Sequence, residues 1–292
     1  MRKLRVLYLF IFLFVFASCG ENSETTPNET FFEEEKELQN VAYGDDPQQK
    51  YDIYLPKNRS SSKTKVIILI HGGGWVQGDK ADMNGVYDYL KFAASEYALV
   101  NINYRLATLT RQPFPTQIDD IKAIVEDLKS KNLEYGILNE YAFVGVSAGA
   151  HLSMLYGYKY DSDKEVKAVV DVVGPTDFLH SSYTNSSNAE TQQIVLAMQL
   201  LVGKSIANEP SYFEGISPRY AVTASSPPTI MFYGGVDTLV PFEQGEVLQQ
   251  TLESFGVTHQ YHFYTTAGHD LGDENIVDAL TKSINFIQTH LK

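Results

Sequence analysis

Cysteine is almost absent from the sequence. One cysteine in 292 residues excludes an internal disulfide, a CxxC motif and a zinc ribbon. Basic residues are also scarce, with 23 Lys and Arg against 36 Asp and Glu and a formal net charge of −13. Nucleic acids and anionic membrane surfaces attract clustered Lys and Arg, so this balance argues against either as the main partner. What is present, 43% hydrophobic and 20% charged residues, is ordinary for a protein that buries a core.

The apolar run near the N-terminus is too short to span a membrane. Residues 6–17 are apolar, follow three basic residues and precede small residues. A helix of this length rises only about 18 Å, against about 30 Å for the hydrocarbon core of a bilayer. A basic start, an apolar middle and a small-residue end are typical of a secretory signal, which we assign to residues 1–18.

The single cysteine lies at the end of this segment. Phe16-Ala17-Ser18-Cys19 resembles a bacterial lipobox, in which the cysteine is lipidated and becomes the new N-terminus. The alternative is an ordinary signal peptide with an incidental cysteine. The resemblance implies that Cys19 is a lipid anchor, and that the protein is exported and held to the bacterial cell envelope on its periplasmic or cell-surface side.

Acidic residues dominate the next segment. Residues 21–37 contain seven acids, one base and little apolar content. Such a composition buries too little surface to order a chain, so residues 19–38 are predicted to form a solvated tether. The remaining residues, 39–292, are predicted to form one folded domain.

Within that domain, short apolar runs alternate with helical patterns, which predicts an α/β fold with a mostly parallel central sheet and helices on both faces. A polar stretch and a following apolar stretch break this alternation, and we interpret 178–215 as a small cover insertion. Strands are predicted at 51–55, 66–70, 98–103, 141–146, 168–173, 229–233 and 260–264, and helices over 118–128, between Pro241 and Gly256, and over 276–291.

A G-x-S-x-G motif follows the predicted strand 141–146. Gly145-Val146-Ser147-Ala148-Gly149 also opens a predicted helix, which is the context that a nucleophile elbow requires. The helix dipole favours negative charge developing near the serine. The motif alone also occurs by chance around structural serines, but its position after a strand favours Ser147 as a nucleophile.

A serine hydroxyl needs a general base. Of seven histidines, His269 lies in a loop just after a predicted strand, where α/β sheets place their sites. Asp237 follows another strand and would orient the imidazole, whereas Asp270 and Asp273 adjoin His269 too closely to reach back easily. The order Ser147, Asp237, His269 is the order expected of α/β-hydrolases.

A glycine-rich loop follows the predicted strand 66–70. In His71-Gly72-Gly73-Gly74-Trp75 the glycines let backbone N–H groups turn toward a ligand, as an oxyanion hole requires. A phosphate loop is excluded because no G-K-[ST] follows. We expect His71 to brace the loop, and Trp75 to wall the acyl pocket rather than join the core.

Together these motifs resemble the α/β-hydrolase serine esterases of the HGGG(W) type. The segments YDIYLP at 51–56, NYRLA at 103–107, SAGAHL at 147–152 and GPTD at 174–177 resemble their compact feruloyl- and acetyl-esterase-like branch. The resemblance spans 39–292 and implies an α/β-hydrolase fold without metal or cofactor. It implies these roles: Ser147 as nucleophile, His269 as base, Asp237 as orienter, and the backbone N–H groups of Gly73, Gly74 and Ala148 as oxyanion donors.

The expected activity is hydrolysis of carboxylic esters through an acyl-enzyme, with acetyl or hydroxycinnamoyl esters on carbohydrate as substrates by family analogy. The expected partners are a small-molecule or carbohydrate ester, and the membrane through the N-terminal lipid only. One alternative is an N-formylkynurenine-type amide hydrolase, which shares the H-G-G-x-W loop but fits export poorly. A non-catalytic binding lipoprotein on a hydrolase scaffold is the other, and it predicts decay of a triad or oxyanion position that the sequence does not show.

Overall fold

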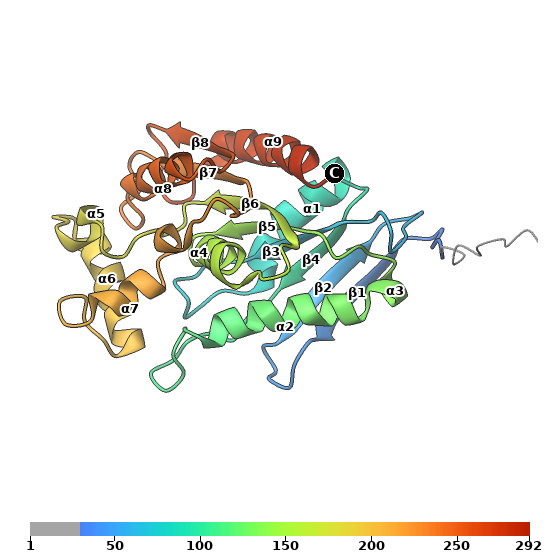
Figure 1. Ribbon diagram of the computed structural model, residues 1–292, viewed down its shortest axis with the longest axis horizontal. Coiled ribbons are helices and arrows are strands. Elements are labelled where there is room, and N and C mark those ends of the chain that lie inside the picture. The colour runs from blue at the N-terminus through green and yellow to red at the C-terminus, as the bar shows by residue number, and fades with distance from the viewer. Residues whose placement is uncertain (1–29) are drawn as a thin grey trace, which may run out of the picture.

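Residues 30–292 are described by the computed structural model, in which one mixed sheet runs through the middle of the molecule (Figure 1). The predicted signal peptide 1–18, the predicted anchor Cys19 and the first part of the predicted tether lie outside the described residues. Within residues 30–292, no helix is long and apolar enough to cross a membrane.

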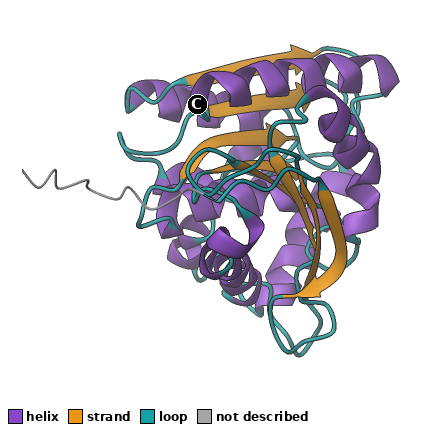
Figure 2. Cartoon of the chain, turned by 90° about the vertical axis from the view of Figure 1, so that its right-hand side faces the viewer, coloured by secondary structure: helices purple, strands orange, loops and turns teal. Residues whose placement is uncertain are grey.

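The sheet has eight strands in the order β1-β2-β4-β3-β5-β6-β7-β8. The first two strands run antiparallel to their neighbours, and every pair from β4 to β8 is parallel. Figure 2 shows the twist of this sheet between its two edges. The strands are β1 (Lys36–Ala42), β2 (Lys50–Leu55), β3 (Val66–Ile70), β4 (Ala98–Ile102), β5 (Tyr141–Val146), β6 (Val166–Val172), β7 (Thr229–Gly234) and β8 (His259–Tyr264).

Helices cover both faces because the central strands are apolar on both sides. All five residues of β3 are buried, and alternate residues point into two separate cores. One core lies under α2, α4 and α8, and the other lies under α1 and α9. These helices are α1 (Asn84–Ala93), α2 (Thr116–Ser130), α4 (Ala148–Leu155), α8 (Glu243–Ser254) and α9 (Asp273–His290); the short helices η1 (Lys80–Met83), α3 (Asn132–Tyr135) and η2 (Tyr156–Tyr160) join them.

The predicted insertion is helical. Between β6 and β7 the chain forms α5 (Ser181–Thr184), α6 (Ala189–Val202), α7 (Pro210–Gly215) and the 3₁₀ helix η3 (Pro218–Ala221). Figure 1 shows α5, α6 and α7 together at one end of the molecule, beyond the ends of the central strands. Asn188 begins α6 by accepting hydrogen bonds from the N–H groups of Glu190 and Thr191, and Gly203 ends it in the left-handed conformation.

The seven predicted strands are confirmed, with ends that differ by at most two residues. The predicted tether is wrong in its last part. Phe32 pairs with Arg59 through backbone hydrogen bonds of 3.0 and 3.2 Å, and β1 begins at Lys36. The acidic composition hid β1 because an antiparallel edge strand needs only one partner and can leave most of its side chains in solvent.

Candidate active site

The turn between β5 and α4 carries Ser147 in a strained conformation. Its φ is +54°, a region that residues other than glycine rarely adopt, and its N–H donates to the carbonyl of Val172 at 2.8 Å. The flanking glycines are required by close packing. A Cβ at Gly145 would lie 2.4 Å from the carbonyl oxygen of Gly149, and one at Gly149 would lie 2.1 Å from that of Ile70. The backbone of the elbow therefore packs directly against the end of β3.

Ser147, His269 and Asp237 are brought together from loops after three different strands. The Oγ of Ser147 lies 3.0 Å from His269 Nε2, and His269 Nδ1 lies 2.7 Å from Asp237 Oδ2. The other oxygen of Asp237 accepts from the N–H groups of Leu239 and Val240 at 2.8 and 2.9 Å. Because both carboxylate oxygens are occupied and the side chain is fully buried, Asp237 can hold the imidazole with its Nδ1 proton toward the acid.

The glycine loop after β3 lies directly beside the serine. A Cβ at Gly72 would lie 3.3 Å from the Cβ of Ser147. Gly73 and Gly74 have φ angles of +104° and +57°, and a Cβ at Gly73 would lie 2.0 Å from the carbonyl oxygen of Gln77. No hydrogen bond among residues 30–292 uses the N–H of Gly73, Gly74 or Ala148. These three donors are therefore available to a negatively charged oxygen next to Ser147.

His71 and Tyr104 hold this loop in place. His71 Nδ1 donates to the carbonyl of Gly72 at 2.7 Å, and the hydroxyl of Tyr104 lies 3.1 Å from the same oxygen and 3.0 Å from that of His71. The two rings stack at 4.3 Å. The carbonyl of Gly72 and the N–H of Gly73 belong to one planar peptide, so fixing the carbonyl also aims the N–H. Burial lowers the pKa of His71, which keeps the ring neutral in this bracing position.

The structure corrects the expectation for Trp75. Its side chain is 3% exposed and packs in the core, edge-on against His151 at 5.4 Å, rather than walling a pocket. The physical reason is that the core satisfies the whole indole: its ring lies 5.9 Å from that of Phe178, and its Nε1 donates to His151 Nδ1 at 3.4 Å. The carbonyl of Trp75 accepts from Gln117 Nε2 and from the N–H of Ala107, both at 2.8 Å. Trp75 thus anchors the far end of the glycine loop.

The remaining histidines and acids lie in other environments. His151 is fully buried, donates to the carbonyl of Ile216 at 2.7 Å, and has its pKa lowered to about 4 by burial. Asp270 is exposed, and Asp273 lies in the first turn of α9. His269 is therefore the histidine that contacts Ser147, and Asp237 is the acid that contacts His269.

A buried carboxyl braces the strand ends beneath the site. Asp171, on β6, accepts from the hydroxyl of Tyr233 at 2.7 Å and from the N–H of Gly174 at 2.8 Å. No basic side chain contacts it in the described part of the chain, and burial raises its pKa to about 7. Sequence reasoning missed this network and the bracing contacts of Tyr104 and Gln117. Segments such as NYRLA at 103–107 contain some of these residues, but no local pattern predicts which distant groups their side chains contact.

We also searched the described residues for side chains that could bind a metal ion together. Across residues 30–292, no group of three or more His, Cys, Asp or Glu side chains is arranged to hold a metal ion. The chemistry that this arrangement can perform is nucleophilic attack by a serine, with a histidine to move its proton and backbone N–H groups to hold an oxyanion.

The sheet order and the elbow define the chain as an α/β-hydrolase, which confirms the predicted fold class. A family model described as BD-FAE matches residues 51–252, and the chain belongs to this family. Esterase LipC of Mycobacterium tuberculosis is 30% identical over 227 residues, which cover 73% of this chain and 54% of LipC. The chain spans about half the length of the curated relatives it matches.

Two solved structures show the same fold. A truncated carbohydrate esterase from gut microbiota aligns with a TM-score of 0.69 at 23% identity, covering 85% of this chain and 95% of that one. A bifunctional GH43-CE protein of Bacteroides eggerthii aligns with a TM-score of 0.71 at 23% identity, covering 88% of this chain and 38% of that protein. Similarity at this level of sequence identity shows the fold alone.

Proposed function

We propose that the chain hydrolyses carboxylic esters with Ser147 as its nucleophile. Ser147 Oγ attacks the ester carbonyl while His269 Nε2 takes the hydroxyl proton, and the oxyanion binds the N–H groups of Gly73, Gly74 and Ala148. His269 then gives that proton to the departing alkoxide, which leaves as the alcohol, and the acyl group stays bonded to Ser147 Oγ. His269 next takes a proton from water, whose oxygen adds to the acyl carbonyl. The bond to Ser147 Oγ then breaks, which releases the acid, and Ser147 takes its proton back from His269.

One observation carries this proposal. A continuous chain of hydrogen bonds joins Ser147 through His269 to a buried Asp237, with distances of 3.0 and 2.7 Å. A serine with a purely structural role would require neither the strained φ of +54° nor three backbone donors left unused beside it. The names of the relatives, which are esterases and a carboxylic ester hydrolase, point to the same bond.

The test is Ser147→Ala assayed on p-nitrophenyl acetate. The variant loses only the hydroxyl, so we expect ester hydrolysis to vanish while the thermal melting curve stays nearly the same. Equal rates for the variant and the native chain would contradict the proposed nucleophile.

For the substrate we propose acetyl or hydroxycinnamoyl esters on carbohydrate. The support is the printed identity of two structural neighbours, one a carbohydrate esterase and the other a GH43-CE protein. A rate panel over acetylated xylan, methyl ferulate, p-nitrophenyl acetate and N-formylkynurenine separates this proposal from its rivals. Preference for the carbohydrate esters supports it, whereas faster turnover of N-formylkynurenine would favour amide hydrolysis.

We also propose that Cys19 anchors the protein to the bacterial cell envelope after export. The support is its position at the end of a signal-like segment in a sequence with no other cysteine. Replacing it by alanine should release the protein from the membrane fraction. Retention of the variant in that fraction would contradict the lipid anchor.

A further inference from the structure

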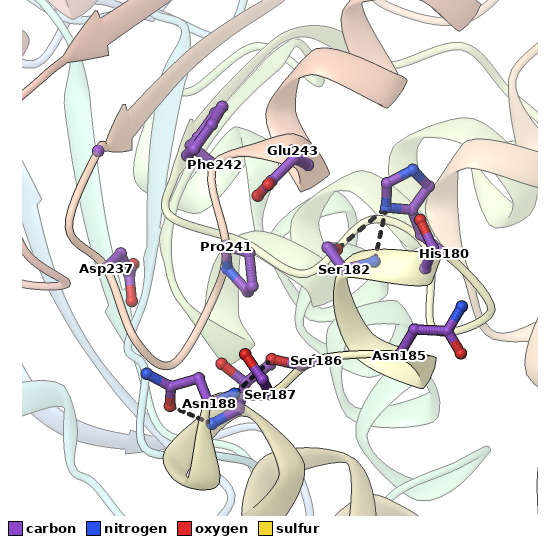
Figure 3. Close-up of a pocket in the computed structure, with 13 residues that line it drawn as sticks. His180, Ser182, Asn185, Ser186, Ser187, Asn188, Asp237, Pro241, Phe242 and Glu243 are labelled. Atoms are coloured by element: carbon purple, nitrogen blue, oxygen red, sulfur yellow. Dashed lines mark hydrogen bonds between the residues drawn. The ribbon is translucent and has the colours of Figure 1, made fainter.

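A cavity of about 520 Å³ lies between the insertion and the loop that joins β7 to α8. Figure 3 shows the lining side chains around one open space, with Asp237 and Phe242 on the β7–α8 side and His180 and Asn185 on the insertion side. The volume is within the range of small-molecule sites. Of the residues that line this cavity, the catalytic proposal uses only Asp237.

Its lining favours a neutral, hydroxyl-rich ligand. The residues around it include no lysine or arginine, so a phosphate or a uronic acid would meet no positive charge. Serine hydroxyls and asparagine amides from 181–188 line one side, and the carboxylate of Glu243 lies opposite. Amides and hydroxyls both donate and accept, and a carboxylate accepts strongly, which matches the donors and acceptors of a sugar.

The walls are held in place while several polar groups remain unused. Thr191 donates to the carbonyl of Thr238 at 2.6 Å, which joins α6 to the opposite loop. Ser182, which contacts His180 Nδ1, accepts from Gln244 at 3.0 Å.

In contrast, the Asn185 amide, the Glu243 carboxylate and His180 Nε2 make no hydrogen bond within the described part of the chain. The cavity therefore combines a fixed shape with free recognition groups. Phe242 adds an aromatic surface, whose electron-rich face suits the C–H groups of a sugar ring.

The position of the cavity relates it to the alcohol part of an ester. The acyl carbonyl must lie at Ser147 and the N–H groups of the glycine loop, whereas the departing oxygen must lie where His269 can protonate it. Asp237 both bonds His269 and lines the cavity, so the cavity adjoins the triad on its acid side. A group attached to the departing oxygen would enter this space if it extended past His269 toward Asp237.

We propose that this cavity is a subsite for a neutral sugar unit in the alcohol part of the substrate, with Glu243 and Asn185 as its specificity-determining residues. This inference rests on the proposed ester hydrolysis, since that reaction defines which part of the ligand lies beyond His269. It assigns a binding role to the insertion, for which no family motif provides one.

The first test measures binding without turnover. The Ser147→Ala form of the full chain is titrated calorimetrically with xylotetraose, cellotetraose, mannotetraose and tetragalacturonate. We expect a neutral tetrasaccharide to bind and tetragalacturonate not to bind. Adding Glu243→Gln or Asn185→Ala should weaken the neutral ligand about tenfold, the size expected for a lost hydrogen bond at a charged or buried partner.

The matched control is Glu246→Gln, because Glu246 lies in the same first turn of α8 but is exposed and does not line the cavity. Equal binding by the Glu243 and Glu246 variants would overturn the inference, as would the failure of all three neutral tetrasaccharides to bind.

A second test separates this inference from the proposed function. With Ser147 intact, Glu243→Gln should raise the KM for acetylated xylotetraose about tenfold relative to Glu246→Gln, and p-nitrophenyl acetate is assayed in parallel as a substrate without a sugar. If the native chain does not hydrolyse p-nitrophenyl acetate or the acetylated sugar, the proposed function fails, and the titration still reports on the cavity. If it hydrolyses both and the Glu243 and Glu246 variants match on the sugar, only the subsite fails.

Discussion

The loops after β3 and β5 and the insertion 178–215 differ in which contacts hold them. In the loops, a Cβ at Gly149 would collide with the carbonyl of Ile70, and His71 and Tyr104 both hold the carbonyl of Gly72. The insertion packs apolar side chains such as Phe178, Met198 and Phe213 into one core and is joined to the β7–α8 loop by side-chain hydrogen bonds such as that from Thr191 to Thr238, while α6 also exposes apolar residues. Close packing of the backbone at the strand ends sets the geometry of the chemistry, whereas side-chain packing and side-chain hydrogen bonds hold the insertion.

Substituting Asp237 tests the tightly held region most severely. In Asp237→Asn the amide keeps the volume but favours the wrong imidazole tautomer, so we expect kcat on p-nitrophenyl acetate to fall by about 10⁴. The control is Asp270→Asn, which alters the exposed acid beside His269 and should change kcat less than about twofold. A comparable loss in the control would show that the orienting acid is misassigned.

The buried carboxyl beneath the site predicts a pH dependence of stability. Folded Asp171 keeps its proton up to about pH 7, whereas an unfolded aspartate loses it near ~3.9. Between these values the folded state binds more protons, so this group lowers the free energy of unfolding as pH rises, by about 1 kcal/mol per pH unit.

Asp171→Asn removes this titration, and its amide can still bond Tyr233 and Gly174. Denaturant unfolding at pH 4.5, 5.5, 6.5 and 7.5 should show the variant gaining stability relative to the native chain as pH rises. Parallel curves for the two proteins would contradict the raised pKa.

A smaller effect is expected from the brace of the glycine loop. Tyr104→Phe removes one donor from the carbonyl of Gly72 but leaves His71 in place. Losing an oxyanion donor outright costs about 10²–10³ in rate, so loosening one should lower kcat about tenfold with little change in KM. Tyr97→Phe, which removes a buried hydroxyl that donates to Leu291, is the control, and a similar kcat for both variants would argue against positioning.

The least effect on chemistry is expected from loosening the insertion. Thr191→Val removes the hydrogen bond to Thr238, so we expect the free energy of unfolding to fall by about 1 kcal/mol and cleavage of 185–191 by proteases to accelerate. The kcat on p-nitrophenyl acetate should stay within about twofold of the native value. A tenfold fall would mean that the insertion and the strand-end loops are one coupled unit.

The same difference explains what the sequence could predict. Aliphatic runs such as 66–70 and 141–146 predicted their strands because both faces of these strands are buried. Ser147, His269 and Asp237 could be selected because each follows a predicted strand, and parallel strands bring their carboxyl ends to one edge. Strand β1 escaped prediction because an exposed edge strand needs no apolar pattern.

Contacts between distant segments could not be read in this way. The burial of Trp75 depends on contacts with His151 and Phe178, and the brace from Tyr104 depends on β4 lying next to β3. The cavity at Glu243 depends on how the insertion folds back against the β7–α8 loop, for which no local pattern exists.

The central claim, that Ser147 is an activated nucleophile, is tested most directly by covalent labelling. The native chain is treated with diethyl p-nitrophenyl phosphate, and the intact mass and the modified peptide are measured alongside residual ester hydrolysis. The account predicts one diethylphosphoryl group per chain, on Ser147, with activity lost in proportion and no label on Ser147→Ala. Labelling at another residue, or equal labelling of Ser147→Ala, would contradict it.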